Sequence, residues 1–211
     1  MNQVAPRKTS ANRAKVEAKI LRAAEKVFAQ KGFSGSSMDA VADQAGLSKQ
    51  LLIYYFPSKE FLYHSVLRNM IDIWIEKMTF VDDPNASPAE IIEAYIRQKI
   101  ELSRDYPNGS KVFAHEIING APVLKDYLLD HLKPQFEKDI QLINKWIENG
   151  QIRPIDPEHL FFTIWASTQT YADFSTQIQL LLGKPKLDQK DFDRASDFLC
   201  HFVLNALGAQ K

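Results

Sequence analysis

The spacing of apolar residues along the chain predicts a protein built from helices. From Arg13 onward, Ile20, Ala24 and Val27 recur at intervals of three or four residues, which places them on one face of a helix that ends before Gly32. No segment shows the strict alternation of apolar and polar residues between hairpin turns that is typical of strands. We therefore expect the chain to be all-α.

Two short segments after this helix have the proportions of a helix-turn-helix. Ser36 or Ser37 is a suitable N-cap for the first segment and Ser48 for the second, residues 49–55, because a serine hydroxyl accepts a free backbone N–H of the first turn. Between the segments, Gly46 supplies the left-handed backbone conformation that a tight turn requires. Together with the preceding helix, they predict an N-terminal three-helix unit of the helix-turn-helix kind.

Proline and glycine residues divide the rest of the chain into further helices. We expect these helices over residues 59–79, 88–105, 109–119, 122–149, 156–183 and 188–208. Pro134 should bend or split the fourth of them, because proline lacks the N–H that a helix interior uses. The predicted organisation is a disordered basic arm (1–12), a helix-turn-helix unit (13–60) and a helical domain (61–211).

The distribution of charge separates the front of the chain from the remainder. The first sixty residues hold ten Lys and Arg against five Asp and Glu, whereas the whole chain has a net charge of zero. A basic front and an acidic remainder are typical of proteins that bind nucleic acid, and a solvated surface gives the same count. Charge alone leaves both interpretations open.

Composition limits the compartment and the chemistry. The single cysteine, Cys200, allows no disulfide within the chain, and neither a membrane-length apolar stretch nor the apolar core of a signal peptide is present, so we expect a cytoplasmic protein. No nucleophile elbow, phosphate loop or dinucleotide fingerprint occurs, and the His115-Glu116 and Cys200-His201 pairs lack the spacing of metal ligands. We expect no enzymatic activity, no cofactor and no metal.

Hydrogen-bonding side chains gather on the outward face of the second short helix. Val41, Leu47 and Leu52 are placed to hold the two short helices together, which leaves the opposite face for phosphates and base edges. A following helix starts at residue 59, and its first N–H groups also attract phosphate. On this pattern alone, a small helical module with a polar surface is the alternative. The candidate DNA contacts are Ser48, Lys49, Gln50, Tyr54, Tyr55 and Lys59.

The stretch from Met38 to Leu62, which reads MDAVADQAGLSKQLLIYYFPSKEFL, resembles the signature of the TetR family of transcriptional regulators. The resemblance implies a homodimer on operator DNA, with recognition helices in successive major grooves, and a C-terminal helical domain that binds a small effector and forms the dimer. It places the residues above at DNA contacts, and we add Ser37 to them. Ile53 stands where the family usually has Tyr, so that contact is lost, replaced by contact with a thymine methyl group, or made by Tyr54.

Further segments resemble one branch of that family, the regulators of pyrimidine utilisation. They are Ser103–Pro107 (SRDYP), Gly120–Pro122 (GAP), Ile155–Pro157 (IDP) and Trp165–Phe174 (WASTQTYADF). This resemblance implies that uracil or thymine releases the protein from DNA and that pyrimidine metabolism is the process controlled. The candidate effector contacts are Trp74, Lys99, Arg104, Trp165, Gln169 and Tyr171.

The side chains of the last segment have chemistry that fits a pyrimidine base. Such a base offers an N–H next to a C=O, and the carboxamide of Gln169 presents the complementary order, while Trp165 is one turn away and able to stack. A satisfied core or subunit interface explains Thr168, Gln169 and Tyr171 equally well. Two alternative functions remain. One is a regulator of the same family that responds to another aromatic or apolar compound, and the other is an all-α interaction protein.

The last two expected helices are the predicted dimer interface. An apolar face at helical spacing on the final helix would pair with its copy in a four-helix bundle. The residues of this face are Phe192, Ala195, Leu199, Phe202, Val203 and Ala206.

Overall fold

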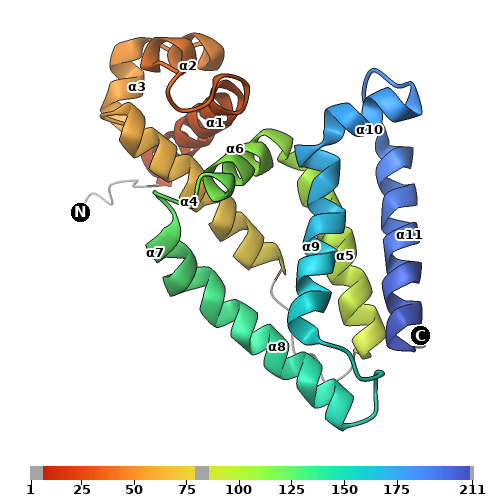
Figure 1. Ribbon diagram of the computed structural model, residues 1–211. Coiled ribbons are helices and arrows are strands. Elements are labelled where there is room, and N and C mark those ends of the chain that lie inside the picture. The colour runs from red at the N-terminus through yellow and green to blue at the C-terminus, as the bar shows by residue number, and fades with distance from the viewer. Residues whose placement is uncertain (1–6, 79–85, 210–211) are drawn as a thin grey trace.

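The computed structural model describes residues 7–78 and 86–209, and every regular element in these ranges is helical (Figure 1). This confirms the predicted all-α class. None of the helices in the described ranges has the length and apolar character needed to cross a membrane. The helices are α1 (Arg7–Lys31), α2 (Met38–Ala45), α3 (Lys49–Tyr55), α4 (Lys59–Met78), α5 (Pro88–Asp105), α6 (Pro107–Ile118), α7 (Lys125–Tyr127), a π-helical turn (Leu128–Leu132), α8 (Lys133–Glu148), α9 (Pro157–Asp173), α10 (Ser175–Leu182) and α11 (Gln189–Leu207).

Helix α1 begins earlier than predicted. We expected residues 1–12 to form a disordered arm, but α1 begins at Arg7, so residues 7–12 are helical, while residues 1–6 lie outside the described ranges. Once a helix has a nucleus, each added residue contributes one hydrogen bond, so the helix extends through a stretch without glycine or proline. The predicted end is confirmed, because α1 closes at Lys31 and Gly32 takes a φ of +67°.

The helix-turn-helix forms as predicted. The Ser37 hydroxyl accepts the Ala40 N–H at 3.2 Å and caps α2, and the Ser48 hydroxyl accepts the Leu51 N–H at 3.2 Å and caps α3. Gly46 closes α2 with a φ of +60°, a left-handed conformation that other residues adopt only with strain.

Helix α6 begins inside a segment that the sequence predicts to be a break. Pro107 stands in the first turn of α6, where its fixed φ suits a helix and its missing N–H costs nothing. Gly109 is also helical, and a Cβ at this position would overlap the Met70 side chain of α4. This glycine therefore permits close packing of α6 on α4 instead of ending a helix.

Two of the long predicted helices differ from a single regular α-helix. The helix expected to bend or split near Pro134 runs without a break through a wide π-helical turn at Leu128–Leu132, and Pro134 lies in the first turn of α8. The expectation of one helix over 156–183 is wrong, because the backbone at Phe174 leaves helical dihedral angles (φ −108°, ψ 24°) and separates α9 from α10.

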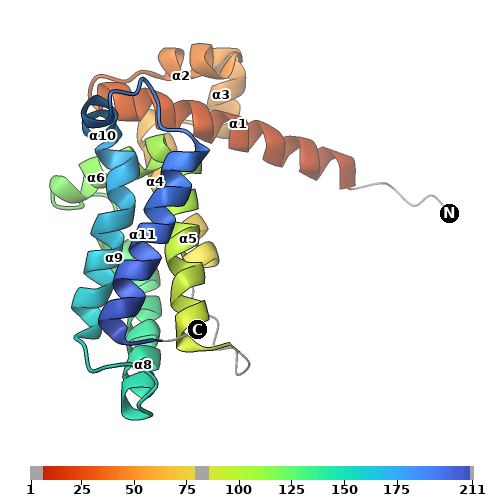
Figure 2. The ribbon, with the colours of Figure 1, turned by 90° about the vertical axis from the view of Figure 1, so that its right-hand side faces the viewer.

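Helices α5, α9 and α11 stand side by side and form the body of the C-terminal part (Figures 1 and 2). Helices α1, α2 and α3 lie at one end of the molecule, and α4 runs from them toward this body. Buried side chains form two clusters, one around α1–α3 and one among α5, α8, α9 and α11, and α4 contributes to both. A displacement of α4 would therefore change the packing of both clusters.

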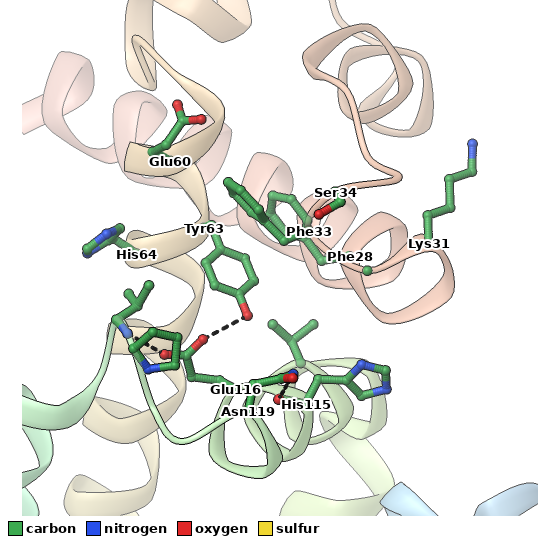
Figure 3. Close-up of a pocket in the computed structure, with 14 residues that line it drawn as sticks. Phe28, Lys31, Phe33, Ser34, Glu60, Tyr63, His64, His115, Glu116 and Asn119 are labelled. Atoms are coloured by element: carbon green, nitrogen blue, oxygen red, sulfur yellow. Dashed lines mark hydrogen bonds between the residues drawn. The ribbon is translucent and has the colours of Figure 1, made fainter.

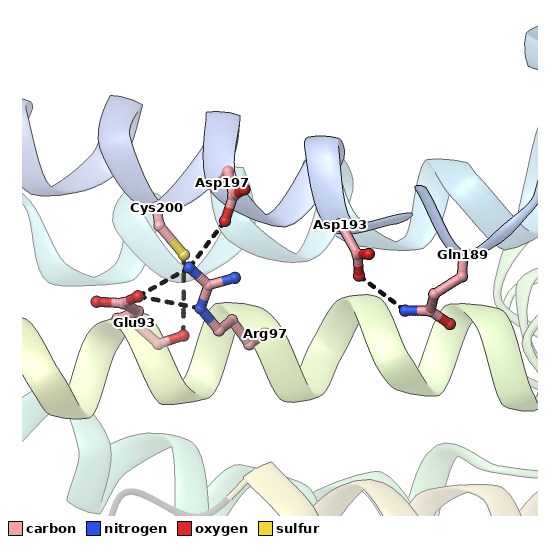
Figure 4. Close-up of polar contacts among 6 residues, drawn as sticks. All are labelled: Glu93, Arg97, Gln189, Asp193, Asp197 and Cys200. Carbon is pink, nitrogen blue, oxygen red and sulfur yellow. Dashed lines mark hydrogen bonds and ion pairs between the residues drawn. The ribbon is translucent and has the colours of Figure 1, made fainter. Parts of the chain in front are cut away.

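Polar contacts fasten α11 to α5 (Figure 4). The Arg97 guanidinium of α5 bonds the Glu93 carboxylate and reaches across to Asp197 of α11, each at 2.9 Å. The Cys200 thiol of α11 donates to the Glu93 carbonyl oxygen at 3.9 Å. These contacts border an apolar seam between the two helices.

The apolar face of α11 that we predicted for dimer contact lies mainly inside the subunit. Phe192, Ala195, Leu199 and Val203 are all less than a tenth exposed, because they belong to the cluster that packs α11 on α5. Helical periodicity identifies an apolar face but does not say which neighbour covers it. The exposed apolar residues of α11 are Phe198, Phe202 and Ala206.

Candidate functional site

Helix α3 presents a mixed polar and apolar surface to solvent. Tyr54 is 71% exposed and Ile53 is 42% exposed, and Lys49 and Gln50 lie on the same exposed side. Leu52 is fully buried and anchors α3 in the cluster with α1 and α2. Helix α3 is therefore anchored on one side and carries donors, a phenol and a branched apolar side chain on the other. These groups have the chemistry to read a major groove.

Some of the predicted DNA contacts are engaged within the protein. Ser37 and Ser48 accept backbone N–H groups as caps, which leaves each hydroxyl proton available for an outside acceptor. The Lys49 ammonium pairs with Asp39 of α2 at 2.8 Å, with both side chains more than half exposed. An exposed ion pair of this kind is worth little, so a phosphate can compete for the lysine.

Lys59 has a structural role that the sequence did not predict. Its ammonium donates to the carbonyl oxygens of Phe33 at 3.0 Å and Ser36 at 3.2 Å, and it lies 4.3 Å from the centre of the Phe33 ring. These contacts fasten the α1–α2 connection to the start of α4. Tyr55, the last residue of α3, is half-buried beside the Arg13 guanidinium, which lies 5.6 Å from the ring centre.

A buried cation lies between two indole rings in the C-terminal part. Lys99 of α5 is 3% exposed, and its ammonium lies 5.3 Å from the centre of the Trp74 ring and 5.8 Å from that of Trp165. Burial lowers the pKa of Lys99 to about 7, against the opposing charge of Asp173. Three of the six predicted effector residues, Trp74, Lys99 and Trp165, therefore lie together around a buried amine.

Polar residues that the sequence analysis missed line the adjoining space. The Trp165 indole N–H donates to the Tyr95 hydroxyl at 2.6 Å, and the Gln135 amide donates to the Asp139 carboxylate at 2.8 Å. Burial raises the pKa of Tyr95, so its hydroxyl stays protonated. With Trp74, these residues border a cavity whose free volume is about 20 Å³, room for about one water molecule.

A sequence signal for Asp139 was present. It interrupts the apolar stripe that Phe136, Ile140 and Ile143 form on α8, and it is 7% exposed. A carboxylate on the buried face of an amphipathic helix requires a partner or a function, because burying a charge is costly.

The remaining predicted effector residues lie elsewhere. Arg104 and Tyr171 border a separate cleft of about 400 Å³ near the α10–α11 connection, and Gln169 is half-buried and borders neither of these two spaces. Arg104 follows Lys99 by five residues, a rotation of about 140° around the helix, which turns it to another side of α5. The six predicted residues therefore do not form one site.

Arg104 and Tyr171 are held by local contacts in that cleft. The Arg104 guanidinium bonds the Asp105 carboxylate at 2.7 Å and the Gln189 side-chain oxygen at 2.8 Å. The Tyr171 ring packs on Phe192 with 6.4 Å between ring centres. These contacts tie the end of α5 and the face of α9 to the start of α11.

Helix α6 connects the buried lysine to the N-terminal helices. The Ser110 hydroxyl of α6 donates at 2.6 Å to Asp173 of α9, the carboxylate whose charge supports Lys99. Beside it, the Ser103 hydroxyl of α5 donates to the Thr168 carbonyl oxygen of α9 at 3.0 Å. A shift of α9 relative to α5 therefore acts directly on α6.

The other end of α6 is bonded to α4 through a buried carboxylate (Figure 3). Glu116 is 3% exposed and accepts the Tyr63 hydroxyl of α4 at 3.2 Å, together with the backbone N–H groups of Val123 at 2.5 Å and Leu124 at 3.1 Å. The Phe28 ring of α1 packs edge-on against Tyr63 at 5.1 Å, above a cleft of about 590 Å³ between α1, α4 and α6. The contact joins three helices within the cluster around α1–α3.

Comparison with known proteins covers nearly the whole chain. Residues 20–66 match the family model of bacterial regulatory proteins, tetR family, and residues 67–210 match the model of the YcdC-like protein C-terminal region. The HTH-type transcriptional regulator RutR of Escherichia coli (strain K12) is 41% identical over 211 residues, which cover 98% of this chain and 99% of RutR. The HTH-type transcriptional repressor KstR2 of Mycobacterium tuberculosis (strain ATCC 25618 / H37Rv) is 25% identical over 158 residues, 72% of this chain and 79% of KstR2.

Solved structures share the arrangement of helices. The ketosteroid transcriptional regulator KstR2 of Mycobacterium tuberculosis superposes with a TM-score of 0.73 at 21% identity, covering 92% of this chain and 95% of that chain. AibR in complex with isovaleryl coenzyme A and operator DNA superposes with a TM-score of 0.68 at 18% identity, covering 89% and 97%. At these identities the likeness is one of fold.

Proposed function

Because the chain belongs to the TetR family of bacterial regulatory proteins, we propose that it represses transcription as a dimer on operator DNA and is released by a pyrimidine base such as uracil or thymine. It is a DNA-binding transcriptional regulator closely related to RutR, and the relatives named above are regulators of transcription and not enzymes. The effector, its site and the repressing role are what we propose.

The observation that carries the effector proposal is the buried Lys99 ammonium between Trp74 and Trp165. An interior that serves only stability avoids a cation at this depth, because desolvation costs more than two aromatic faces return. A small planar ring that fits between the indoles and accepts a hydrogen bond from Lys99 would compensate that cost. Uracil and thymine are flat, uncharged and rich in carbonyl oxygens, as the resemblance to pyrimidine regulators leads us to expect.

We assign DNA reading to the exposed face of α3. Lys49, Gln50 and Tyr54 supply donors for base edges and phosphates, and Ile53 replaces the hydroxyl usual in the family with an apolar surface that suits a thymine methyl group. The other proposed contacts, mainly to phosphate, are Ser37, Ser48, Tyr55 and the remaining donor of Lys59.

We place the dimer contact on the outward faces of α9 and α11. Phe198 and Phe202 of α11 are 66% and 56% exposed and stack on each other at 6.2 Å, and Phe162 of α9 is 48% exposed. Large exposed aromatic rings on a helix surface are costly to leave in water. Packed against a second copy, they would form the four-helix bundle that helical dimers use.

Effector binding would reach α3 through helix displacement. The cavity bordered by Trp74 and Trp165 has room for about one water molecule, so a base fits only if the surrounding helices move apart. Displacement of α9 acts on α6 through Asp173 and Ser110, and α6 acts on α4 through Glu116 and Tyr63. A base that prefers the displaced arrangement therefore disfavours the spacing of recognition helices that fits DNA.

Thermal unfolding tests the effector half of this proposal. The purified protein is heated with and without millimolar uracil or thymine, with a purine base as the control. A ligand at a hundred times its dissociation constant stabilises a protein by about 2.7 kcal/mol, a readily visible shift in Tm. A shift with pyrimidines alone supports the proposal, and equal curves with every base contradict it. Binding to DNA that weakens steeply with added salt tests the other half.

The alternative effector class is an apolar or aromatic compound without hydrogen-bonding edges. The indoles of Trp74 and Trp165 and the ring of Phe136 favour it, since they form part of the cavity wall. The substitution Lys99→Met separates the two classes, because a pyrimidine that accepts a hydrogen bond from Lys99 would lose affinity while an apolar compound would not. Retained pyrimidine binding in this variant would move recognition away from Lys99.

A further inference from the structure

The cleft near the α10–α11 connection is a second space for a ligand, and the proposed function does not use it. Its free volume is about 400 Å³, within the range of small-molecule sites, and it lies between the end of α5, the start of α6, α9, α10 and the connection to α11. It shares no lining residue with the space of about 20 Å³ beside Trp74 and Trp165. A small flat molecule therefore fits in this cleft without displacing a helix.

Polar side chains in the wall of this cleft are available to a ligand. Within residues 7–78 and 86–209, six of them make no side-chain hydrogen bond and no ion pair, although all but Lys186 are partly buried. Each of the six can donate a hydrogen bond. They are Asn108 and Lys111 of α6, Tyr171 of α9, Ser175 and Gln179 of α10, and Lys186 of the α10–α11 connection.

Positive charge exceeds negative charge among the residues that line the cleft. Lys111, Lys186 and Arg104 border it, whereas the one carboxylate in its wall, Asp188, is engaged as the N-cap of α11. The Arg104 guanidinium uses three of its five N–H groups in the contacts described above, which leaves two. An anion is therefore attracted to this wall and finds donors there.

An aromatic surface adjoins these donors. The Tyr171 ring packs on Phe192, with 6.4 Å between ring centres, and both residues border the cleft. Burial raises the pKa of Tyr171, so its hydroxyl stays protonated and is able to donate. A ligand with a flat ring gains a stacking contact from this wall.

We propose that this cleft is a second ligand site, which binds a small molecule that carries a flat ring and a carboxylate or phosphate group. The anionic group bonds Lys111 and Lys186, and the ring lies against Tyr171. This inference goes beyond the proposed effector and does not depend on it, because the cleft and the space beside Trp165 have separate walls.

A ligand at this position acts on α6. Lys111 belongs to α6, Tyr171 to α9 and Lys186 to the connection before α11, so a bound anion with its ring joins these three segments. Lys111 directly follows Ser110, whose hydroxyl donates to Asp173 of α9. The ligand thus reinforces the attachment of α6 to α9, which is the attachment through which the proposed effector would reach α4.

Calorimetric titration of the full chain with benzoate and with phenyl phosphate, at low salt, tests the inference. Benzamide has the same ring without the charge, and inorganic phosphate has the charge without the ring. We expect the better of the two ring anions to bind about tenfold or more tightly than either control, since a charged hydrogen bond contributes about that factor. The better anion also distinguishes a carboxylate site from a phosphate site. Equal affinity for that anion and for either control, or no binding of both ring anions, overturns the inference.

Variants of the two cleft lysines locate the bound anion. Lys111→Met should weaken its binding about tenfold, and Lys186→Met about threefold, because an exposed ion pair contributes less. Both variants should keep the helical circular dichroism of the parent. Lys138→Met removes an exposed lysine of α8 outside the cleft and is the matched control, which should keep the parent's affinity. Undiminished affinity in either cleft variant overturns the inference.

Failure of the proposed effector gives a different result. In that case uracil and thymine do not bind, while the ring anion binds to the parent and to Lys99→Met with equal affinity, which upholds the second site. Binding of uracil without binding of benzoate or phenyl phosphate overturns the second site alone.

Discussion

The Arg22 guanidinium of α1 lies 3.6 Å from the centre of the Tyr106 ring, at the junction of α5 and α6. Its Nη1 atom also donates to the Asp105 carbonyl oxygen at 3.2 Å and to the Glu25 carboxylate at 3.2 Å. Arg22 thus attaches the first helix of the DNA-binding unit to the helical body at a point far along the chain. Glu25 is 2% exposed, and burial raises its pKa while the charge of Arg22 opposes that rise.

Substitution Arg22→Ala should destabilise the protein by about 1–3 kcal/mol at neutral pH, because it removes the stacked cation and leaves Glu25 buried without its partner. Chemical denaturation measures the loss. In the variant, the folded state favours the protonated form of the Glu25 carboxyl. The loss of unfolding free energy relative to the parent should therefore shrink as the pH falls toward 5. Lys26→Ala, an exposed cation one turn further on α1, is the control and should change stability by less than about 0.5 kcal/mol. A pH-independent deficit would contradict the role of Glu25.

Substitution Glu116→Ala should cost more than Tyr63→Phe, although each removes the hydrogen bond between α4 and α6. The carboxylate accepts Tyr63 on one oxygen and two backbone N–H groups on the other, so alanine also leaves those two N–H groups without their acceptor. We expect losses of about 2–3 kcal/mol and about 1 kcal/mol, measured by urea denaturation. Equal losses would mean that the α6–α7 connection does not depend on the Glu116 oxygen that accepts the N–H groups of Val123 and Leu124.

Lys99 predicts a rise in stability with pH. Its pKa is lowered to about 7 in the folded state from an ordinary value near 10.5, so the unfolded chain binds more protons between these values. The free energy of unfolding should therefore rise from about pH 7 to pH 10, with a limiting slope of about 1.4 kcal/mol per pH unit from this group. Lys99→Met, of similar size and uncharged, should lack this component and be more stable than the parent below pH 7. Parallel pH profiles for the two proteins would contradict a buried, uncompensated lysine.

Substitution Phe198→Glu should weaken the dimer, because it places a charge in the centre of the proposed interface. We expect the sedimentation of the variant to shift from dimer to monomer at micromolar concentration, with its helical circular dichroism retained. Ile118→Glu, an 81% exposed apolar residue at the end of α6, is the matched control and should remain dimeric. A monomer shift in both variants, or in neither, would place the interface elsewhere.

The helix-turn-helix was predictable because its signals are local. Ser37, Gly46 and Ser48 fix helix ends through contacts three to five residues away, and such contacts are encoded in short sequence patterns. The helix expected from residue 109 begins instead at Pro107, and the close packing of Gly109 on Met70, which is distant in sequence, gives no local signal. The same reason explains why the inward face of α11 resembled a dimer face.

The effector site was predictable only in part. Trp74, Lys99 and Trp165 were identified through resemblance and do converge. Arg104 lies on the same helix as Lys99, and Tyr171 on the same helix as Trp165, but both border another cleft. Asp139 was missed although it interrupts the apolar stripe of α8, a pattern that indicates an inward-facing acid but not the cavity it borders. Convergence of side chains from α4, α5, α8 and α9 is a property of packing, which sequence periodicity constrains but does not determine.

The affinity for operator DNA with and without uracil, compared between the parent protein and Lys99→Met, tests the central claim most directly. The DNA is a duplex selected from a random library with the parent protein, and fluorescence anisotropy at fixed salt gives the dissociation constants. The account predicts that saturating uracil weakens the parent's DNA binding by about tenfold or more and leaves Lys99→Met unchanged, with similar affinities for both proteins before uracil is added. Parent affinity that does not respond to uracil or thymine, or an equal response in Lys99→Met, would contradict it.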